Sequence, residues 1–260
     1  MANPKMPKGK MVKVAVFIII VLMVFFAGYQ FAIYQKNAGD NLLPHFNIGT
    51  PKTSSCFGLP ECGFQCPTSQ PCAHPDKPVI YLYPTKNEII NVKVGYKAGI
   101  SKSSPLYNPI FGWNILAHPN GGLTNLADHN DYSYLYWEGN PESMNFNMDE
   151  GFVISGKNTD SFLKQELTKI GLNSRESADF VSYWGPIMGV NSFNLIHFAQ
   201  GSEYTSKVKL TISPKPESLL RVFMVYKSLK NPISVVPEIF PSFDRSGFTV
   251  VEWGGSELNN

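Results

Sequence analysis

The acids that could carry out hydrolysis are the first candidates for chemistry in this sequence. Glycoside hydrolysis needs two carboxylates about 5–10 Å apart, one of which donates a proton. The sequence alone does not place any two of the candidate carboxylates at that distance, and acids at strand ends are commonly solvated. Glu252 differs because it lies between Val251 and Trp253, so strand alternation could turn it away from solvent. The acids that could form a pair are Glu138, Asp149, Glu150 and Glu252.

A second set of polar side chains in residues 118–131 could bind a metal ion. Imidazole and carboxylate groups are metal ligands, but the segment holds neither an H-E-x-x-H helix pair nor a D-x-D-x-D-G calcium loop. Asp, Asn and His are also frequent in turns, because their side chains bond to nearby backbone. We therefore favour solvated turns, with a metal site as the alternative. The metal candidates are His118, Asp128, His129 and Asp131.

A row of aromatic residues follows that segment. In a strand, Tyr132, Tyr134 and Tyr136 share one face, while Leu135 and Trp137 lie on the other. An exposed tyrosine row could stack on sugar rings or bind a protein. We favour the alternative, an aromatic cross-strand ladder that is half buried between sheets.

The sequence argues against a cofactor and against nucleic acid. It contains no G-x-S-x-G elbow, P-loop or G-x-G-x-x-G turn, so we expect no cofactor. Residues 1–36 hold five lysines and no acid, whereas the other 224 residues hold 17 basic and 20 acidic side chains, a net charge of −3. A nucleic-acid-binding domain needs a basic surface, and this acidic body lacks the charge for one.

The elements that must position these residues begin with an apolar segment, Val14–Tyr34. Its 21 residues would span about 31 Å as a helix, which matches the hydrocarbon core of a membrane at about 30 Å. Four lysines precede it or lie at its edge, so we expect residues 1–13 to be a cytoplasmic tail and the body to lie outside the cytoplasm. A cleaved signal peptide is the alternative, although the run is long and its exit lacks paired small residues.

Residues 35–77 read as a stalk that contains every cysteine of the chain. Asn, Gly, Pro, Ser and Thr dominate its composition, and its apolar residues show neither the period of a strand nor that of a helix. An even number of cysteines in an exported segment predicts two disulfides, with three pairings open. Zinc is the alternative, with His74 or His45 as further ligands, but paired C-x2-C knuckles are absent. The cysteines are Cys56, Cys62, Cys66 and Cys72.

The body, residues 78–255, is predicted to be an α+β domain, and residues 256–260 form a short tail. Charged residues are only 16% of the chain, while aromatic residues are 13%, which suits a β-rich fold. Two amphipathic helices, 160–170 capped by Thr159 and 175–184 capped by Ser174, suggest a helical hairpin. Mostly antiparallel strands with this helical insert predict a β-sandwich. The transmembrane helix predicted at Val14–Tyr34 precedes it. The predicted strands are 78–84, 88–96, 112–118, 123–127, 131–138, 193–198, 204–212, 219–226, 235–239 and 247–253.

The body resembles an uncharacterised family of bacterial exported or membrane-anchored proteins. The matching phrases are Lys77–Pro84 (KPVIYLYP), Tyr134–Gly139 (YLYWEG), Arg221–Tyr226 (RVFMVY) and Gly247–Gly255 (GFTVVEWGG). In that family a cysteine often directly precedes the first phrase, whereas here Cys72 lies five residues before it. The resemblance implies an extracytoplasmic setting and supports the start of the domain, but it brings no activity and no catalytic residues.

These observations lead to two hypotheses. The first is a single-pass membrane protein, inserted with its N-terminus in the cytoplasm, whose external domain is a binding or structural module at the cell envelope. Its partner would be an envelope polymer or a surface protein. The second is an envelope glycan hydrolase that uses the carboxylates or a metal ion named above. The sequence leans toward the first, a protein that is not an enzyme.

Overall fold

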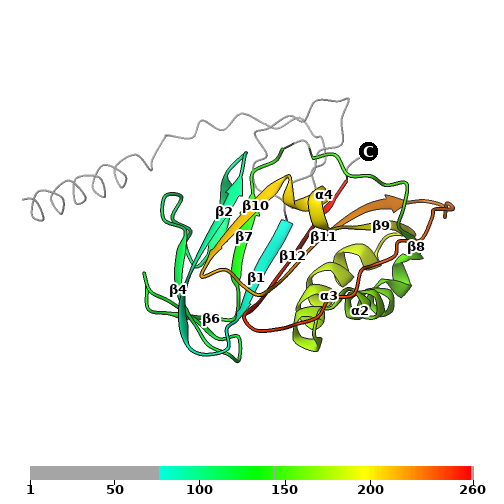
Figure 1. Cartoon of the computed structure of the whole chain (residues 1–260). Coiled ribbons are helices and arrows are strands. Elements are labelled where there is room, and N and C mark those ends of the chain that lie inside the picture. Colours follow the sequence, from blue (N-terminus) through cyan, green and yellow to red (C-terminus); the bar gives the residue numbers. More distant parts are fainter. Residues whose placement is uncertain (1–75, 143, 259–260) are drawn as a thin grey trace, which may run out of the picture. The chain divides into compact units, whose positions relative to one another are not determined.

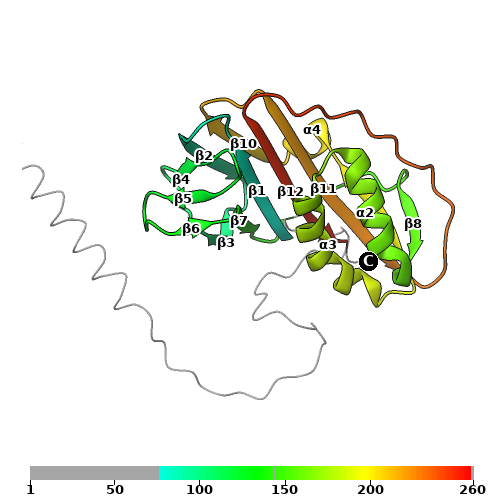
Figure 2. The ribbon, with the colours of Figure 1, turned by 90° about the horizontal axis from the view of Figure 1, so that it is seen from below.

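The structure, a computed structural model, describes residues 76–142 and 144–258. These residues form a five-stranded sheet and a seven-stranded sheet, with a pair of helices on the outer face of the larger one (Figure 1 and Figure 2). The domain is thus α+β with two mostly antiparallel sheets and a helix pair, which confirms the predicted class at that level.

The larger sheet holds the centre of the domain. Its neighbouring strands are antiparallel, except that β11 and β12 are parallel. A parallel pair needs a long crossover, and residues 230–248, here called the strap, provide it. In spatial order the strands are β3 (Ile100–Ser104), β7 (Leu135–Gly139), β1 (Asp76–Tyr83), β12 (Thr249–Glu257), β11 (Ser218–Leu229), β9 (Phe193–Ala199) and β8 (Phe152–Ser155).

The smaller sheet shows the alternation expected of a sheet with one wet face. Ile90, Val92 and Val94 of its second strand are buried against the larger sheet, while Lys93 between them is exposed. In spatial order its strands are β10 (Val208–Ser213), β2 (Glu88–Tyr96), β4 (Trp113–Ala117), β5 (Leu123–Asn125) and β6 (Asp131–Tyr132).

The helix pair covers the outer face of the larger sheet. The helices are η1 (Gly156–Asn158), α2 (Thr159–Ile170), α3 (Ser174–Gly189) and the short α4 (Gly201–Thr205). The predicted caps were wrong by one residue, because Asn158 and Asn173 occupy the N-cap positions. Asn173 forms a capping box with Glu176, and this fixes the start of α3. Gly171 ends α2 in a left-handed conformation.

The second helix is longer than the sequence suggested. The predicted helix ends at residue 184, but Pro186 lies inside α3, which continues to Gly189. Burial of Trp184 and Met188 against the sheet holds the last turns in place, which shows tertiary packing outweighing the helix-breaking tendency of proline.

Several predicted strands were displaced or divided. The predicted strand 131–138 is divided into β6 and β7, which belong to different sheets, and residues 100–104, which belong to none of the predicted strands, form β3. Residues 204–207 precede β10 and include the end of α4. Within 235–239 the structure shows a single bridge, from Val236 to Glu150.

Two apolar layers hold the domain together. One lies between the sheets and includes Trp113 and Trp137, and the other lies between the larger sheet and the helices and includes Trp184 and Trp253. All four indoles are at most 2% exposed. Burying a large apolar side chain contributes about 1.5–3 kcal/mol, so these two layers dominate the stability of the domain.

The membrane predictions concern other parts of the chain. No helix within 76–142 and 144–258 has the length and apolarity needed to cross a membrane. The predicted tail 1–13, the predicted span 14–34 and all four cysteines lie outside the described residues. The first described strand begins at Asp76 and the last ends at Glu257, two residues outside each predicted domain boundary.

Candidate functional site

The strongest candidate acids lie on opposite faces of the larger sheet. The Nε1 atom of Trp137 donates to Oε1 of Glu252 at 3.3 Å, so both side chains face the smaller sheet. Glu138 follows Trp137 in β7 and therefore points to the other face, where Lys102 binds it at 2.8 Å. The sheet separates the Glu138 and Glu252 carboxylates. Asp149 and Glu150 are exposed just before β8, the edge strand farthest from the β3 and β7 end of the sheet, where Glu138 lies.

Glu252 is part of a buried ion pair rather than a solvated acid. Its Oε2 atom accepts from Nε of Arg221 at 2.5 Å, and it has no solvent exposure. Arg221 also donates from Nη1 to the carbonyl of Val208, and its guanidinium lies 4.7 Å from the ring centre of Tyr204. The pair thus links β11, β12, β10 and α4 between the sheets, a structural role.

The candidate metal ligands are mostly engaged in local turns. The Oδ1 atom of Asp128 accepts from the backbone N–H of Asn130 at 2.9 Å, and this bond lowers the pKa of the exposed carboxyl. Its Oδ2 atom accepts from the hydroxyl of Tyr132 at 2.8 Å. His129 is exposed in the same turn, with a positive φ of 58°. This is the arrangement of a solvated turn.

The other two candidates have similar local partners. Asp131 accepts from the hydroxyl of Thr124 at 2.7 Å, and Nδ1 of His118 lies 3.1 Å from Oδ1 of Asn87. Within the described ranges, no three His, Cys, Asp or Glu side chains are grouped so that they could hold a metal ion.

The tyrosine row is divided between the two sheets. Tyr132 belongs to β6 of the smaller sheet, whereas Tyr134 and Tyr136 pack half buried on the helix side of the larger sheet. There they meet Tyr183 of α3, and Lys77 places its ammonium group among the three rings. We call Tyr134, Tyr136 and Tyr183 the tyrosine cage.

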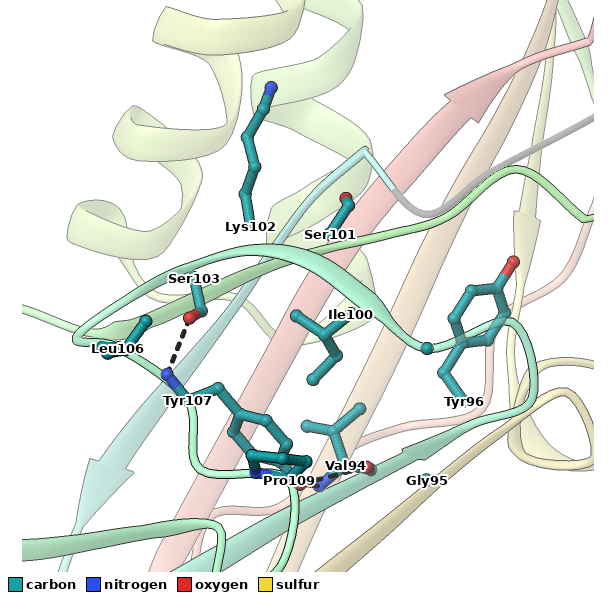
Figure 3. A pocket seen from close by; sticks show the side chains of 11 residues that line it. Val94, Gly95, Tyr96, Ile100, Ser101, Lys102, Ser103, Leu106, Tyr107 and Pro109 are labelled. Carbon is teal, nitrogen blue, oxygen red and sulfur yellow. Dashed lines mark hydrogen bonds between the residues drawn. The ribbon is translucent and has the colours of Figure 1, made fainter. Parts of the chain in front are cut away.

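A cavity of about 600 Å³ opens between β2 and β3, where the chain passes from one sheet to the other. In Figure 3 the side chains of Val94, Ile100 and Tyr107 face one another across it, while Lys102 points away. Its lining is mostly apolar, with Tyr96 at one side. A concave apolar site of this size is the usual form of a binding site in proteins.

The cavity is bordered by residues 105–112, here called the apolar loop. Tyr107 anchors it, because its hydroxyl accepts from the N–H of Val94 at 2.9 Å and donates to the carbonyl of Val94 at 3.1 Å. The Nε1 atom of buried Trp113 donates to the carbonyl of Pro105 at 2.9 Å. β4 begins at Trp113, opposite Val92, so at Val94 the hydroxyl of Tyr107 takes the place of a β4 residue as the partner of β2.

The apolar loop presents large apolar side chains to solvent. Leu106 is 86% exposed, Ile110 71% and Phe111 61%. The carboxamide oxygen of Asn108 accepts from the N–H groups of Ile110 and Phe111, each at 2.9 Å, which fixes the turn between them. A second hollow of about 240 Å³ lies on the loop's other side, lined in part by Leu126. The exposed residues are thus carried on a well-anchored scaffold.

One ionisable cluster was missed by sequence reasoning. His197 of β9 has Glu238 of the strap 2.6 Å from Nδ1 and Glu203 of α4 2.9 Å from Nε2. Burial acts to lower the pKa of His197, but the hydrogen bonds and charges of Glu238 and then Glu203 raise it above its usual value. Glu238 also accepts from the N–H of Phe198, so this cluster pins the strap to β9.

A signal for Arg221 and His197, the two charged groups that were missed, is present in the sequence. Like Glu252, each lies between apolar neighbours within its strand. A lone ionisable residue in such a run must find a partner when the strand is buried. Which partner it finds depends on the order of the strands, which alternation does not reveal.

Comparison of the chain with protein-family models, with curated proteins and with solved structures gave no match. The described residues therefore form an α+β domain that carries an exposed apolar loop beside a cavity. The four phrases on which the family resemblance rests lie in or beside β1, β7, β11 and β12. These strands are neighbours at the centre of the larger sheet, so the phrases are brought together by the fold.

Proposed function

We propose that this chain is a single-pass membrane protein whose described domain binds a partner protein outside the cytoplasm, at the cell envelope. The observation that carries the proposal is the apolar loop, where Leu106, Ile110 and Phe111 are exposed beside a cavity on a well-anchored turn. Solvent-exposed apolar groups gathered in one place are characteristic of interaction sites. Because the loop is already fixed, binding would cost little ordering of the chain.

The chemistry of this surface favours a protein over a glycan. From Ser103 to Ala127 the chain has no Asp, Glu, Lys or Arg, and this run includes the whole apolar loop. Depletion of charge with exposed apolar anchors is the composition of a protein interface core. Sugar recognition instead needs several fixed polar groups beside a flat ring. The proposed partner therefore presents an uncharged apolar surface, with apolar side chains that enter the cavity.

The membrane part of the proposal is supported by the sequence. The apolar segment Val14–Tyr34 has the length of a membrane span, and the lysines before it favour a cytoplasmic N-terminus. This orientation puts the four cysteines in an oxidising compartment, where two disulfides would stiffen the stalk. A glycan hydrolase has less support, because the sheet separates Glu138 from Glu252 and Arg221 neutralises Glu252.

Site-specific photocrosslinking tests the binding proposal. The full chain carries a photoreactive amino acid at position 110 and is irradiated in intact cells, with position 164 on the exposed face of α2 as control. We expect one protein adduct specific to position 110. We expect Leu106→Ser with Phe111→Ser to abolish it and Val190→Ser, at a residue 85% exposed elsewhere, to leave it intact.

Two outcomes would contradict the proposal. Adducts that are the same at positions 110 and 164, or that survive the paired loop substitutions, would show that the apolar loop does not select a partner. Turnover of peptidoglycan or of a surface glycan by the purified protein would favour the hydrolase instead. Orientation is tested separately by thiol labelling. Free thiols in intact cells that react only with membrane-permeant reagents would overturn both the external stalk and its disulfides.

A further inference from the structure

The tyrosine cage surrounds one cation with three aromatic faces. The ammonium nitrogen of Lys77 lies 4.8 Å from the ring centre of Tyr136, 5.4 Å from that of Tyr183 and 5.6 Å from that of Tyr134. All three distances fall within the range of cation–π attraction, about 6 Å. The rings come from β7, α3 and the turn before β7, so the fold itself assembles the cage.

Two of the rings are held by other aromatic groups. The ring of Tyr134 packs edge-on against Tyr81 at 5.6 Å and 68°, and Tyr81 in turn donates to Asp179 at 2.8 Å. The ring of Tyr183 packs edge-on against buried Trp184 at 5.0 Å and 87°. Neither arrangement involves Lys77.

The third ring is held through its hydroxyl. Tyr136 donates a short hydrogen bond to Oε1 of Glu138, whose other oxygen lies 2.8 Å from Nζ of Lys102. Every ring of the cage therefore has a contact that positions it without Lys77. Removal of the lysine side chain would leave a cage that is already formed.

The electrostatic surroundings favour a cation at this point. Burial, and after it the negative charges of Asp76 and Glu138, together raise the pKa of Tyr183 to about 12. Burial and then Glu138 also raise the pKa of Tyr136. Tyr136 and Tyr183 therefore stay neutral at pH 7, and the ring faces of the cage turn their negative potential toward the cation.

Lys77 is a poor match for the site it fills. Its backbone φ is +53°, in the left-handed region that residues other than Gly, Asn and Asp rarely adopt. A primary ammonium is also strongly hydrated, and ring faces do not replace hydrogen bonds to water. A quaternary ammonium group has no N–H to satisfy, so aromatic faces suit it better.

We propose that the tyrosine cage is a binding site for quaternary ammonium groups, in which Lys77 is a displaceable resident. The ligand's positive group replaces the lysine ammonium among the rings of Tyr134, Tyr136 and Tyr183. No covalent step is involved.

The first test measures binding of tetramethylammonium and choline to the full chain in maltoside detergent by calorimetry, with sodium chloride at equal ionic strength as control. In the native chain, the Lys77 ammonium competes with the added ligand for the cage at an effective concentration near the millimolar range. Lys77→Ala and Lys77→Ser remove this competitor, so each should bind tetramethylammonium at least about 10-fold more tightly than the native chain. No gain in affinity in either variant would overturn the proposal.

Matched variants show whether the rings are responsible. In the Lys77→Ala background, Tyr136→Ala should abolish binding, and Tyr136→Phe, which keeps the ring face, should retain it. Tyr132→Ala, in the other sheet, should have no effect. Equal loss for Tyr136→Phe and Tyr136→Ala, or loss for Tyr132→Ala, would contradict a cage.

A second measurement needs no variant and covers the case in which Lys77 variants fail to fold. Acylation of lysines followed by mass spectrometry reports how often the Lys77 amine leaves the cage. Choline should raise the labelling rate of Lys77 several-fold and leave that of exposed Lys86 unchanged. An unchanged rate at Lys77 up to saturating choline would overturn the proposal.

The same labelling separates two sources of the ligand. In nanodiscs of phosphatidylcholine, raised Lys77 labelling without added choline would identify a lipid headgroup. Raised labelling only when choline is added, in either phosphatidylcholine or phosphatidylglycerol nanodiscs, would identify a soluble quaternary ammonium compound. No change under any of these conditions would count against the cage as a binding site.

Discussion

Arg221 and Lys77 place their positive charges over tyrosine rings in two very different parts of the domain. The guanidinium of Arg221 lies 4.7 Å from the ring centre of Tyr204, between the sheets, where Arg221 is 7% exposed and Tyr204 is fully buried. The ammonium of Lys77 lies among three rings that are only partly buried, at the edge of the helix layer.

The difference lies in what else holds each cation. Arg221 is bound by the carboxylate of Glu252 and the carbonyl of Val208, so its removal would leave buried groups without a partner. The contacts of Lys77 described above are with ring faces, and these keep their own support when it leaves. The cation–π contact of Arg221 is therefore part of the buried core, whereas we propose that the contact of Lys77 with the tyrosine cage can be exchanged for that of a ligand.

The largest expected effect concerns the interior pair. Glu252→Leu leaves Arg221 buried without its counter-ion, and we expect the free energy of unfolding to fall by about 3–5 kcal/mol, measured by urea unfolding. The control is Glu142→Ala, which removes the partner of Lys97 at a surface pair 3.2 Å apart. That change should cost less than about 1 kcal/mol. Similar losses of stability in the two variants would show that water reaches the Arg221–Glu252 pair and screens it.

The ring beneath Arg221 gives the next effect. Tyr204→Leu removes the aromatic face and should lower the free energy of unfolding by about 2 kcal/mol. Tyr204→Phe should cost less, about 1 kcal/mol at most, because it keeps the ring face and removes only the hydroxyl beside Arg221. Both are measured by urea unfolding. A large loss in Tyr204→Phe would mean that the hydroxyl, and not the ring, supports Arg221.

A third charged cluster, at His197, lies between these extremes and should respond to pH. Its pKa is raised above 6.5, so the folded state binds this proton more tightly than the unfolded state. The added stability is present below pH 6.5 and is lost as the pH rises through the folded pKa. We expect His197→Gln to be less stable than the native chain by about 1.5 kcal/mol at pH 6, with a smaller gap at pH 9.

Urea unfolding of both proteins between pH 6 and pH 9 measures that gap. Glu203→Gln and Glu238→Gln serve as controls, because each removes one of the two carboxylates that hold the imidazolium. A gap of constant size across this range would mean that His197 does not change its charge there.

Local patterns predicted much of the fold. Alternation in 88–96 matched β2 residue for residue, and the apolar stripe of 160–170 matched α2 to within one residue. Both predictions rest on interactions between near neighbours. Alternation failed at 131–138, where it placed Tyr132 and Tyr136 on one strand, because the change of sheet between them depends on distant partners.

The site depended even more on distant contacts. The sequence drew attention to Glu252 but not to its partner, since Arg221 meets it through the parallel register of β11 and β12. Tyr134 and Tyr136 were singled out as a row, whereas Tyr183 and Lys77, which complete the cage, are contributed by α3 and β1. Exposure of the apolar loop was not predictable, because it follows from the anchoring of Tyr107 on Val94.

The smallest effect tests the strain at Lys77 apart from the cage. Lys77→Ala and Lys77→Gly both remove the ammonium, but only glycine adopts the φ of +53° without steric cost. We expect the glycine variant to be more stable than the alanine variant by about 1 kcal/mol, measured by urea unfolding. In a strand with negative φ the order is reversed, since glycine there costs about 0.5–1 kcal/mol more than alanine. The sign of this difference therefore tells whether the backbone opposes the cation in the cage, and an alanine variant equal to or more stable than glycine would mean that it does not.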